Sequence, residues 1–404
     1  MEFTPSAAAR EAMRRLTQAG FDAVYVGGCV RDACLGLAAH DFDLASSAHP
    51  AEVLALFADC RTVKTGIRHG TVTVLFDGEP VEITTYRADG AYADGRRPEQ
   101  VRFSRSLEED LRRRDFTVNA LCVDAAGNLI DRFGGLADLA ARRIRAIGDP
   151  DERFSEDALR VLRALRFAAR LGFSVESETA AALLRHREAL RALSAERVRA
   201  ELFLLLEGAD AARVLAAHAA VFFAVLPQLD TPDFARQCAL LPALAQEAPL
   251  RLACLLLSCG DAAAQRALSS LALSKRTRRR IAAAVRAARE PIPAREEDRL
   301  RLLGRCGEAV CADAAALRLA ADPRDGAALA LRELIARRPC CTVAQLAVTG
   351  GDLMEAGVPF GPAVGRTLEA LLGEVIAGRA PNERAALLAA ARGMAGENGG
   401  GPSA

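Results

Sequence analysis

Two adjacent glycines, Gly27 and Gly28, interrupt an apolar run close to the N-terminus. Residues 24–26 (Val-Tyr-Val) predict a short buried strand, and residues 29–35 predict a helix that Gly36 ends. Glycines in such a turn leave backbone N–H groups uncovered by Cβ atoms, so a phosphate can approach the start of the helix. Arg31 lies in the first helical turn, where we expect it to contact such an anion or to brace the turn. The segment therefore predicts an α/β unit with a phosphate-binding turn.

Two carboxylates follow the turn at alternate positions. Asp41 and Asp43 belong to the sequence Asp-Phe-Asp-Leu, which predicts extended structure over residues 41–44. Strand side chains alternate between faces, so both carboxylates are expected on one face, with Phe42 and Leu44 in the core. Paired carboxylates beside a phosphate-binding turn are suitable ligands for Mg²⁺. Taken separately, the glycine pair is more simply explained as an ordinary turn, and the carboxylate pair as a solvated strand edge.

In this order and spacing, the glycine turn and the carboxylate pair resemble the signature of the nucleotidyltransferase superfamily. Arg31-Asp32 and the Leu35-Gly36 pair narrow the resemblance to the family of class II tRNA nucleotidyltransferases (CCA-adding enzymes) and bacterial poly(A) polymerases, with the Bacillus-type CCA-adding enzymes most similar. One departure is His40, because lysine is common in the family at this position before the first carboxylate.

This resemblance implies an α+β fold, with a polymerase-β-like α/β head followed by an all-helical neck, body and tail. It implies that Asp41 and Asp43 are catalytic and bind Mg²⁺, and that the nucleotide phosphates are held by Gly27, Gly28 and Arg31. The expected domains are a catalytic head at 1–148, a neck at 149–207, a body at 208–305 and a tRNA-binding tail at 306–404.

A β-hairpin is predicted after the carboxylates. Residues 71–76 and 81–86 are rich in β-branched side chains, and Asp77-Gly78 lies between them. In the second strand Glu82 faces away from Val81 and Ile83, so it is either a third carboxylate of the site or an ordinary solvent-facing residue. The family carries an acidic residue on this strand, which implies a catalytic role for Glu82.

The sequence Leu-Arg-Arg-Arg-Asp-Phe-Thr-Val-Asn-Ala occupies residues 111–120. Consecutive arginines alone indicate a solvated helix face. Followed by Asp-Phe-Thr-Val-Asn-Ala, they resemble the second motif of the family. By that resemblance Arg114 and Asp115 bind or position the triphosphate and ribose, with Asn119 in support.

A helix is predicted from Ser155, as its N-cap, to residue 171, with Gly172 ending it. Asp157 and Arg160 are three residues apart, so their side chains are expected to be neighbours on the polar face. For an arbitrary helix the simpler interpretation is an intrahelical salt bridge.

A second interpretation comes from base edges. Cytosine and adenine both present an amino donor beside a ring-nitrogen acceptor, which suits a carboxylate beside a guanidinium, whereas uracil and guanine present the opposite pattern. Residues 156–168 resemble the nucleobase-reading motif of the family closely, which implies that Asp157 and Arg160 select C and A. By the same resemblance Arg163 and Arg166 join the nucleotide-binding set.

Three further segments resemble parts of the family. Residues 88–97 resemble the flexible loop of CCA-adding enzymes, and residues 196–202 resemble a motif that buttresses the nucleotide helix. Residues 348–392 resemble the tail of the Bacillus-type enzymes. The basic stretch at 275–289 is either a solvated helix face or a track for RNA phosphates, and we favour the track.

The chain of 404 residues has a net charge of only +1, so RNA binding would depend on local basic clusters. Its eleven cysteines contain no C-x-x-C pair, so a zinc site is not expected, and scattered free thiols fit a reducing cytoplasm. No apolar window is long enough to span a membrane. The expected activity is template-independent addition of C, C and A to tRNA from CTP and ATP. The alternatives are an A-adding enzyme or a poly(A) polymerase of the same family, and a catalytically silent RNA-binding protein. Monomer and homodimer both stay open.

Overall fold

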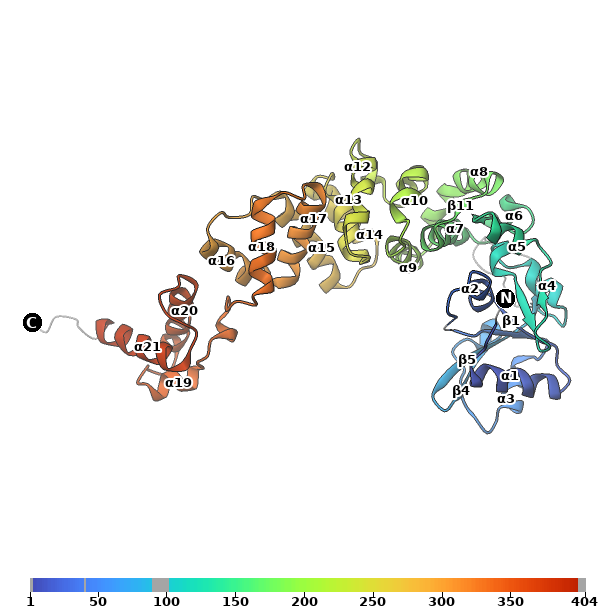
Figure 1. Cartoon of the computed structure of the whole chain (residues 1–404), viewed down its shortest axis with the longest axis horizontal. Helices are drawn as coiled ribbons and strands as arrows, with labels where there is room; N and C mark the ends of the chain where they lie inside the picture. The colour runs from blue at the N-terminus through green and yellow to red at the C-terminus, as the bar shows by residue number, and fades with distance from the viewer. Residues whose placement is uncertain (1–2, 40, 89–101, 399–404) are drawn as a thin grey trace, which may run out of the picture. The chain divides into compact units, whose positions relative to one another are not determined.

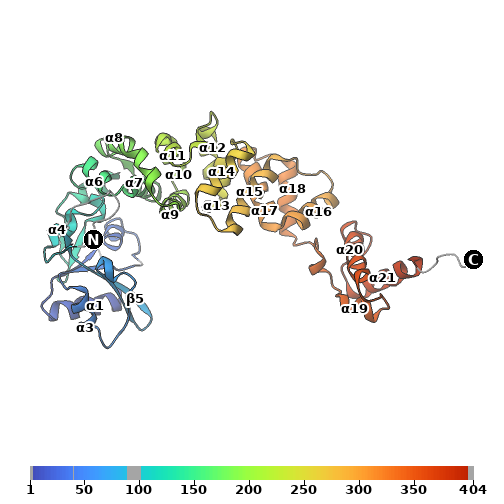
Figure 2. The same cartoon turned by 180° about the vertical axis from the view of Figure 1, so that it is seen from behind.

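The computed structural model describes residues 3–39, 41–88 and 102–398 (Figure 1). The chain forms two compact units, Met1–Cys238 with Ser270–Ala272, and Ala239–Ser269 with Leu273–Ala404. The first unit contains every strand that the structure describes, whereas the described elements of the second unit are helical (Figure 2). The expected combination of a mixed head and a mostly helical remainder is confirmed.

The main sheet of the first unit has seven strands in the order β3-β4-β5-β2-β1-β8-β9. Strands β2 and β5 pair in parallel, and the other neighbours in this sheet pair antiparallel. The strands are β1 (Ala23–Val26), β2 (Leu44–Ser46), β3 (Arg61–Val63), β4 (Thr71–Phe76), β5 (Glu79–Thr85), β8 (Cys122–Asp124) and β9 (Leu129–Ile130).

The predicted hairpin is present, and a second one follows later in the chain. Strands β4 and β5 are joined by Asp77 and Gly78, which have φ values of 48° and 92°, as a two-residue hairpin turn requires. Strands β8 and β9 turn around Gly127 at φ 87°. Turn chemistry that the sequence carries locally therefore determines both registers.

The two faces of β1 pack against different partners. The Tyr25 hydroxyl donates to the carbonyl of Ala9 (3.3 Å) in helix α1 (Ala7–Gln18). Val24 and Val26 point the other way, into a cluster with Leu111 of helix α4 (Leu107–Arg112). Side-chain alternation along one short strand thus orients the sheet between two helical layers.

The strand that carries the first carboxylates is shorter than predicted, because β2 begins at Leu44 and not at residue 41. β1 ends at Val26, whose N–H donates to the Asp43 carbonyl (3.1 Å), and Gly27 then turns away at φ 84°. No strand partner is left for residues 41 and 42, so Asp41 lies in a loop. His40 lies outside the described residues.

The helix predicted from Ser155 is two helices, which corrects the sequence-based boundary. Helix α6 (Pro150–Glu156) contains Ser155 in its last turn, and α7 (Leu159–Leu171) begins after a break at Asp157, whose φ and ψ are −147° and 101°. The residue at the N-cap of α7 is Ala158 and not Ser155, and the Asp157 carboxylate just before it accepts from the N–H of Leu159 (3.1 Å), the first residue of the helix. As predicted, α7 ends at Gly172, with φ 67°.

Further helices of the first unit surround this pair. They are α2 (Gly28–Cys34), α3 (Pro50–Leu56), α5 (Gly135–Ala140), α8 (Ser177–His186), α9 (Ala195–Leu206), α10 (Ala211–Ala217), α11 (Ala219–Val225) and the single turn η2 (Thr117–Asn119). Two small sheets join segments distant in sequence, β6 (Arg87–Ala88) with β7 (Arg102–Phe103) and β10 (Arg143–Ile144) with β11 (Ser174–Val175). Of the loop expected to be flexible at 88–97, residues 89–97 lie outside the described residues.

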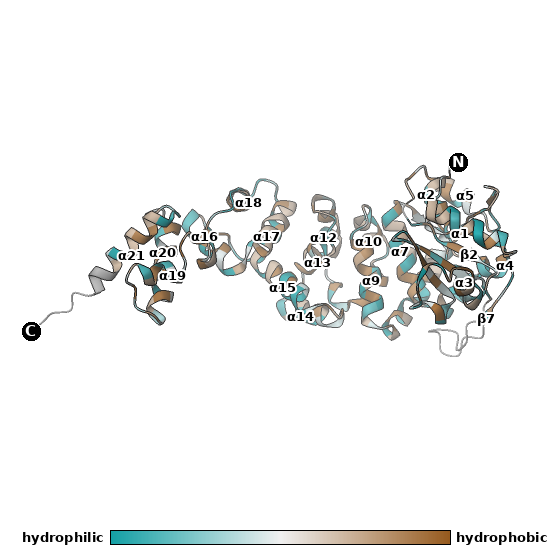
Figure 3. Ribbon diagram, turned by 90° about the horizontal axis from the view of Figure 1, so that it is seen from below, coloured by the Kyte–Doolittle hydropathy of each residue, from teal (hydrophilic) through white to brown (hydrophobic). Residues whose placement is uncertain are grey.

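The second unit consists of packed helices whose apolar sides face inward (Figure 3). They are α13 (Ala248–Leu256), α14 (Asp261–Ser270), α15 (Lys275–Arg289), α16 (Glu296–Cys306), α17 (Glu308–Ala321), α18 (Gly326–Ala336), α19 (Gly350–Glu355), α20 (Pro362–Ile376) and α21 (Arg384–Asn398), and α12 (Phe234–Leu240) precedes them. The last three share a separate core that includes Leu353, Leu371 and Leu387. None of the helices in the described ranges has both the length and the apolarity needed to cross a bilayer.

Candidate active site

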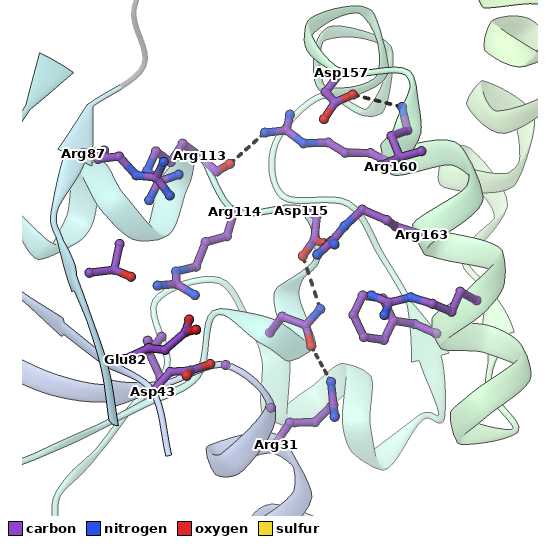
Figure 4. Close-up of a pocket in the computed structure, with 18 of the residues that line it drawn as sticks. Arg31, Asp43, Glu82, Arg87, Arg113, Arg114, Asp115, Asp157, Arg160 and Arg163 are labelled. Carbon is purple, nitrogen blue, oxygen red and sulfur yellow. Dashed lines mark hydrogen bonds and ion pairs between the residues drawn. The ribbon is translucent and has the colours of Figure 1, made fainter. Parts of the chain in front are cut away.

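A cavity of about 590 Å³ lies in the first unit, between the glycine turn, the β5 strand and helix α7 (Figure 4). Its lining includes nine arginines and four carboxylate side chains, so it is suited to a polyanionic ligand. The arginines are Arg31, Arg87, Arg113, Arg114, Arg160, Arg163, Arg166, Arg170 and Arg197, and the carboxylates are Asp43, Glu82, Asp115 and Asp157.

The glycine turn forms one wall of the cavity. Gly27 has φ 84° and ψ −132°, a conformation that L side chains rarely adopt, so the chain requires glycine there. A Cβ atom on Gly27 would lie 3.9 Å from a guanidinium nitrogen of Arg114, and one on Gly28 would lie 3.6 Å from Arg31. Two arginines therefore lie directly against the exposed backbone of the turn, as a phosphate-binding turn requires.

Asp43 and Glu82 lie side by side at the sheet end of the cavity (Figure 4). Surrounding protein that displaces water raises the pKa of Asp43 to about 6, and the negative charge of Glu82 adds to the shift. Asp43 is nevertheless exposed to the cavity, so its carboxylate is available to a ligand. As predicted, Glu82 and Thr84 share the cavity face of β5, while Val81 and Ile83 are buried.

Asp41 is the predicted site residue that the structure does not bring into the cavity lining. It is exposed, although it is close enough for its charge to raise the pKa of Asp43 slightly. Across the described residues, no group of three or more His, Cys, Asp or Glu side chains is arranged to hold a metal ion. The pair formed by Asp43 and Glu82 still suits a hard divalent cation, because two oxygen donors share one cavity wall and their mutual repulsion would be relieved by a positive charge.

Asp110 fixes the arginines of the second motif. Its carboxylate is completely buried and accepts from Arg113 (2.5 Å), Arg114 (3.1 Å) and the backbone N–H of Arg87 (3.1 Å). Burial alone would raise the pKa of Asp110, but the two arginines outweigh it, so the pKa is lowered and the carboxylate stays charged. Arg114 is consequently held in one orientation, against the glycine turn.

A second chain of contacts runs from Asp115 through Asn119 to the glycine-turn helix (Figure 4). Asp115 accepts from Arg163 (2.6 Å) and from the Asn119 amide (3.2 Å), and the Asn119 carbonyl accepts from Arg31 (2.8 Å). Burial would raise the pKa of Asp115, but the Arg163 ion pair and these hydrogen bonds lower it overall. The three motifs of the sequence thus meet through one polar network.

Asp157 and Arg160 lie at the opposite side of the cavity from Asp43 and Glu82 (Figure 4). The intrahelical salt bridge considered from the sequence is not the observed pairing, because Asp157 precedes the helix. Asp157 instead binds Arg197 of α9 (2.9 Å). Arg160 binds Glu156 (2.6 Å) and donates to the Arg113 carbonyl (2.9 Å). The carboxylate and the guanidinium are therefore held independently of each other.

Glu201 of α9 forms ion pairs with two arginines of α7, Arg166 at 2.9 Å and Arg163 at 3.8 Å. Burial raises the pKa of Glu201 although these arginines oppose the shift. The expected buttressing role of residues 196–202 agrees with these contacts.

Among the predicted site residues, ten lie in the lining together with Asp43 and Glu82, and only Asp41 lies outside it. The ten are Gly27, Gly28, Arg31, Arg114, Asp115, Asn119, Asp157, Arg160, Arg163 and Arg166. Sequence reasoning did not assign Arg87, Arg113, Arg170 and Arg197 to the site. Helical spacing signalled Arg170, seven residues after Arg163, whereas no local pattern marks Arg87.

Comparison with family models gives three matches along the chain. Residues 23–145 match the poly A polymerase head domain, and residues 172–231 match a probable RNA and SrmB-binding site of polymerase A. Residues 246–391 match the putative tRNA nucleotidyltransferase domain 2.

Whole-length relatives agree with these matches. The CCA-adding enzyme of Levilactobacillus brevis is 43% identical over 394 residues, which cover 95% of this chain and 96% of that protein. The enzyme of the same name from Lacticaseibacillus paracasei is 40% identical, covering 93% of both chains. The crystal structure of the Bacillus stearothermophilus CCA-adding enzyme in complex with CTP superposes with a TM-score of 0.78 at 33% identity, covering 97% of this chain and 98% of that one. The resemblance inferred from the motifs, including its Bacillus type, is confirmed.

Proposed function

The chain belongs to the family of CCA-adding enzymes, and we propose from this premise how its arginine-lined cavity performs the family's reaction. The protein is an RNA nucleotidyltransferase that adds C, C and A to the 3′ end of tRNA from CTP and ATP and releases pyrophosphate. The observation that carries the proposal is the arrangement of the cavity, with acidic residues at one end, arginines along its length and the Asp157–Arg160 pair at the other end.

Nucleotidyltransferases of this kind depend on a divalent metal. We propose Mg²⁺, held by Asp43 and Glu82, with Asp41 completing the set from its neighbouring loop. Bound there, the metal would lower the pKa of the tRNA 3′-hydroxyl and stabilise the pyrophosphate leaving group. The raised pKa of Asp43, which comes first from burial and then from the charge of Glu82, supports the assignment, because a cation would offset both effects.

The triphosphate is proposed to lie on the glycine turn. The uncovered backbone of Gly27 and Gly28 can donate to phosphate oxygens, and the guanidiniums of Arg31 and Arg114 are already beside it. Asp110 and Asn119 hold these two arginines before the ligand arrives. Asp115, between the two ends of the cavity, is placed to orient the ribose.

Base selection is proposed for Asp157 and Arg160. A carboxylate that accepts from the amino group and a guanidinium that donates to the ring nitrogen accommodate both cytosine and adenine, without a nucleic-acid template. Arg197 orients Asp157, while Glu156 and the Arg113 carbonyl orient Arg160. Each group keeps its position if the other is removed, so the two contributions can be measured separately.

The exposed start of α15 is proposed to bind tRNA phosphates. Lys275, Arg276, Arg278 and Arg279 are exposed, and none of them makes an ion pair within the described part of the chain. These cations lie at a helix N-terminus, where the macrodipole disfavours positive charge by about 0.3–1 kcal/mol each. Cations that destabilise the helix in this position are more readily explained by a function, which we propose is binding of tRNA phosphates.

Arg280, the last cation of the run, serves the protein itself. It binds Asp313 (2.7 Å) and Glu247 (3.2 Å), and the hydrogen bond to Asp313 is the main reason that its pKa is raised. The proposed phosphate track is therefore limited to the four residues before it.

Reversing these charges separates binding from stability. In the triple variant Arg276→Glu, Arg278→Glu, Arg279→Glu, we expect a higher KM for tRNA and a weaker salt dependence, with the KM for CTP unchanged. The same changes should raise thermal stability, because glutamates suit a helix N-terminus. Arg324→Glu, an exposed arginine elsewhere in this unit, is the matched control. If the salt dependence of tRNA binding is unaltered, the four cations do not bind phosphates, and they form an ordinary solvated helix face.

The reaction itself is tested with tRNA that ends at the discriminator base, incubated with CTP, with ATP and with both. The proposal requires two added nucleotides with CTP and three with both. No extension with CTP, together with addition of one A to a tRNA ending in CC, would indicate an A-adding enzyme, and long A tails would indicate a poly(A) polymerase. We propose that the reaction takes place in the cytoplasm, where tRNA and nucleotides occur. The proposed domains are a head at 1–148, a neck at 149–207, a body at 208–305 and a tail at 306–404.

A further inference from the structure

Phe167 of α7 contacts the charged groups of three different cavity arginines. The guanidinium carbon lies 4.2 Å from the ring centroid for Arg166, 5.5 Å for Arg31 and 5.6 Å for Arg163. All three distances fall within the range of cation–π attraction. The ring is nearly buried, with 7% of its surface exposed, and it lines the same cavity.

These arginines come from separate parts of the sequence. Arg31 belongs to the glycine-turn helix α2, whereas Arg163 and Arg166 belong to α7, beside the proposed base-reading residues (Figure 4). Three guanidiniums around one ring repel one another. Asp115 and Glu201 offset part of that repulsion by binding Arg163 and Arg166. Arg31 binds Asp32 and Asn119, and toward α7 it contacts the Phe167 ring.

We propose that Phe167 is a positioning residue for the nucleotide, whose electron-rich ring faces hold these three guanidiniums in place. Without the ring, the repulsion would let them spread, and the triphosphate would have to order them on binding. This inference rests on the proposed function, because it assigns the arginines to CTP and ATP. It assigns the ring an electrostatic effect exerted through its neighbours, with no contact to the reacting atoms.

Phe167 also has a packing role, which the test must separate from the electrostatic one. Its ring makes an edge-to-face contact with Phe116 at a centroid distance of 5.9 Å. Replacement by leucine would alter packing and charge together. Fluorination removes electron density from the ring face while it changes the ring's size very little, so it weakens cation–π attraction selectively.

The experiment replaces Phe167 with 4-fluoro-, 3,5-difluoro- and 3,4,5-trifluorophenylalanine in the full chain. We expect the KM for CTP and for ATP to rise stepwise with fluorine number, by about tenfold at three fluorines. The KM for tRNA and the melting temperature should stay near their wild-type values. The same series at Phe222, a buried ring in the same unit with no cation over it among the described residues, is the matched control and should leave every parameter unchanged.

Two outcomes would overturn the proposal. One is a nucleotide KM that does not change along the Phe167 series, and the other is an equal rise at Phe222. Both presuppose a wild-type protein that adds C and A to tRNA, so failure of the wild type would refute the proposed function and not the role of Phe167. The Phe167→Tyr variant, whose ring keeps its electron-rich face, should bind nucleotides better than Phe167→Leu.

Discussion

Replacing Asp157 by asparagine should change which nucleotide the protein accepts more than how stable it is. The asparagine side chain keeps an oxygen that can cap the Leu159 N–H, so α7 should start at the same residue. It also gains an amide N–H₂ group, which can donate to the carbonyl of uracil or guanine after a flip. The variant therefore turns an acceptor-only site into one that suits either base pattern.

The expected losses of stability and of nucleotide discrimination follow from the exposure of the Asp157–Arg197 ion pair and from the hydrogen bond to the base. The Asp157–Arg197 ion pair is partly open to solvent, with side-chain exposures of 27% and 29%, so its loss should cost at most about 1 kcal/mol. For a chain of this size, such a loss lowers the melting temperature by a few degrees. Discrimination against UTP and GTP should fall by about 1–3 kcal/mol, or about 5- to 150-fold, because one mismatched hydrogen bond is removed.

The assay is kcat/KM for all four nucleotides on tRNA ending at the discriminator base and on tRNA ending in CC. The matched control is Asp151→Asn, the same substitution in α6, where Asp151 binds Arg185 (2.6 Å) outside the cavity. The control should leave the four ratios unchanged. If Asp157→Asn also keeps the wild-type preference for CTP and ATP, then Asp157 does not read the base, and its interaction with Arg197 is only structural.

Three other predictions concern the remaining parts of the site. Asp43→Asn should abolish incorporation of both C and A while tRNA binding stays intact. Gel-based extension and filter binding would check the two halves of this prediction, and Mg²⁺-dependent turnover in the variant would refute the metal assignment. A chelator should stop the wild-type reaction, and added Mg²⁺ should restore it, without a change in the unfolding midpoint. Asp110→Asn should destabilise the first unit by about 3 kcal/mol in urea, because it leaves the partly buried Arg113 and Arg114 without their fully buried carboxylate. Arg113 and Arg114 hold the folded pKa of Asp110 below that of an unfolded aspartate, so its stabilisation is present above the unfolded pKa and is lost as the pH falls through the folded pKa. The variant should therefore lose less stability in acid than the wild type does.

The sequence predicts the chemistry of the site well because local rules act on each motif. Gly27 needs a positive φ, Asp77-Gly78 needs a hairpin turn, and Glu82 alternates with Val81 and Ile83 along a strand. Each of these statements depends on a few neighbouring residues, so each could be made without the fold. The resemblance then supplies roles that no local rule contains, such as that of Asp115.

The pairings inside the site were not predictable in the same way. Helical spacing predicted that Asp157 and Arg160 are neighbours. A break between α6 and α7 separates their side chains, and Arg160 forms its ion pair with Glu156. The break itself depends on Arg197, 40 residues later, which binds the Asp157 carboxylate in its extended position. Contacts between residues far apart in sequence decide these partners, and a single sequence does not specify them.

Those partners explain how so many arginines can share one cavity. Each of five carboxylates binds at least one cavity arginine: Asp110, Asp115, Glu156, Asp157 and Glu201. The pairs reduce the repulsion between guanidiniums and also fix their orientation while the protein folds. A nucleotide then meets groups that are already ordered, so less side-chain entropy is lost on binding, and the fixed dipoles act on charge as it develops in the reaction. On this reasoning, neutralising any one of the five carboxylates should weaken nucleotide binding, even though each removal makes the cavity more positive. A cavity that bound by net charge alone would show the opposite.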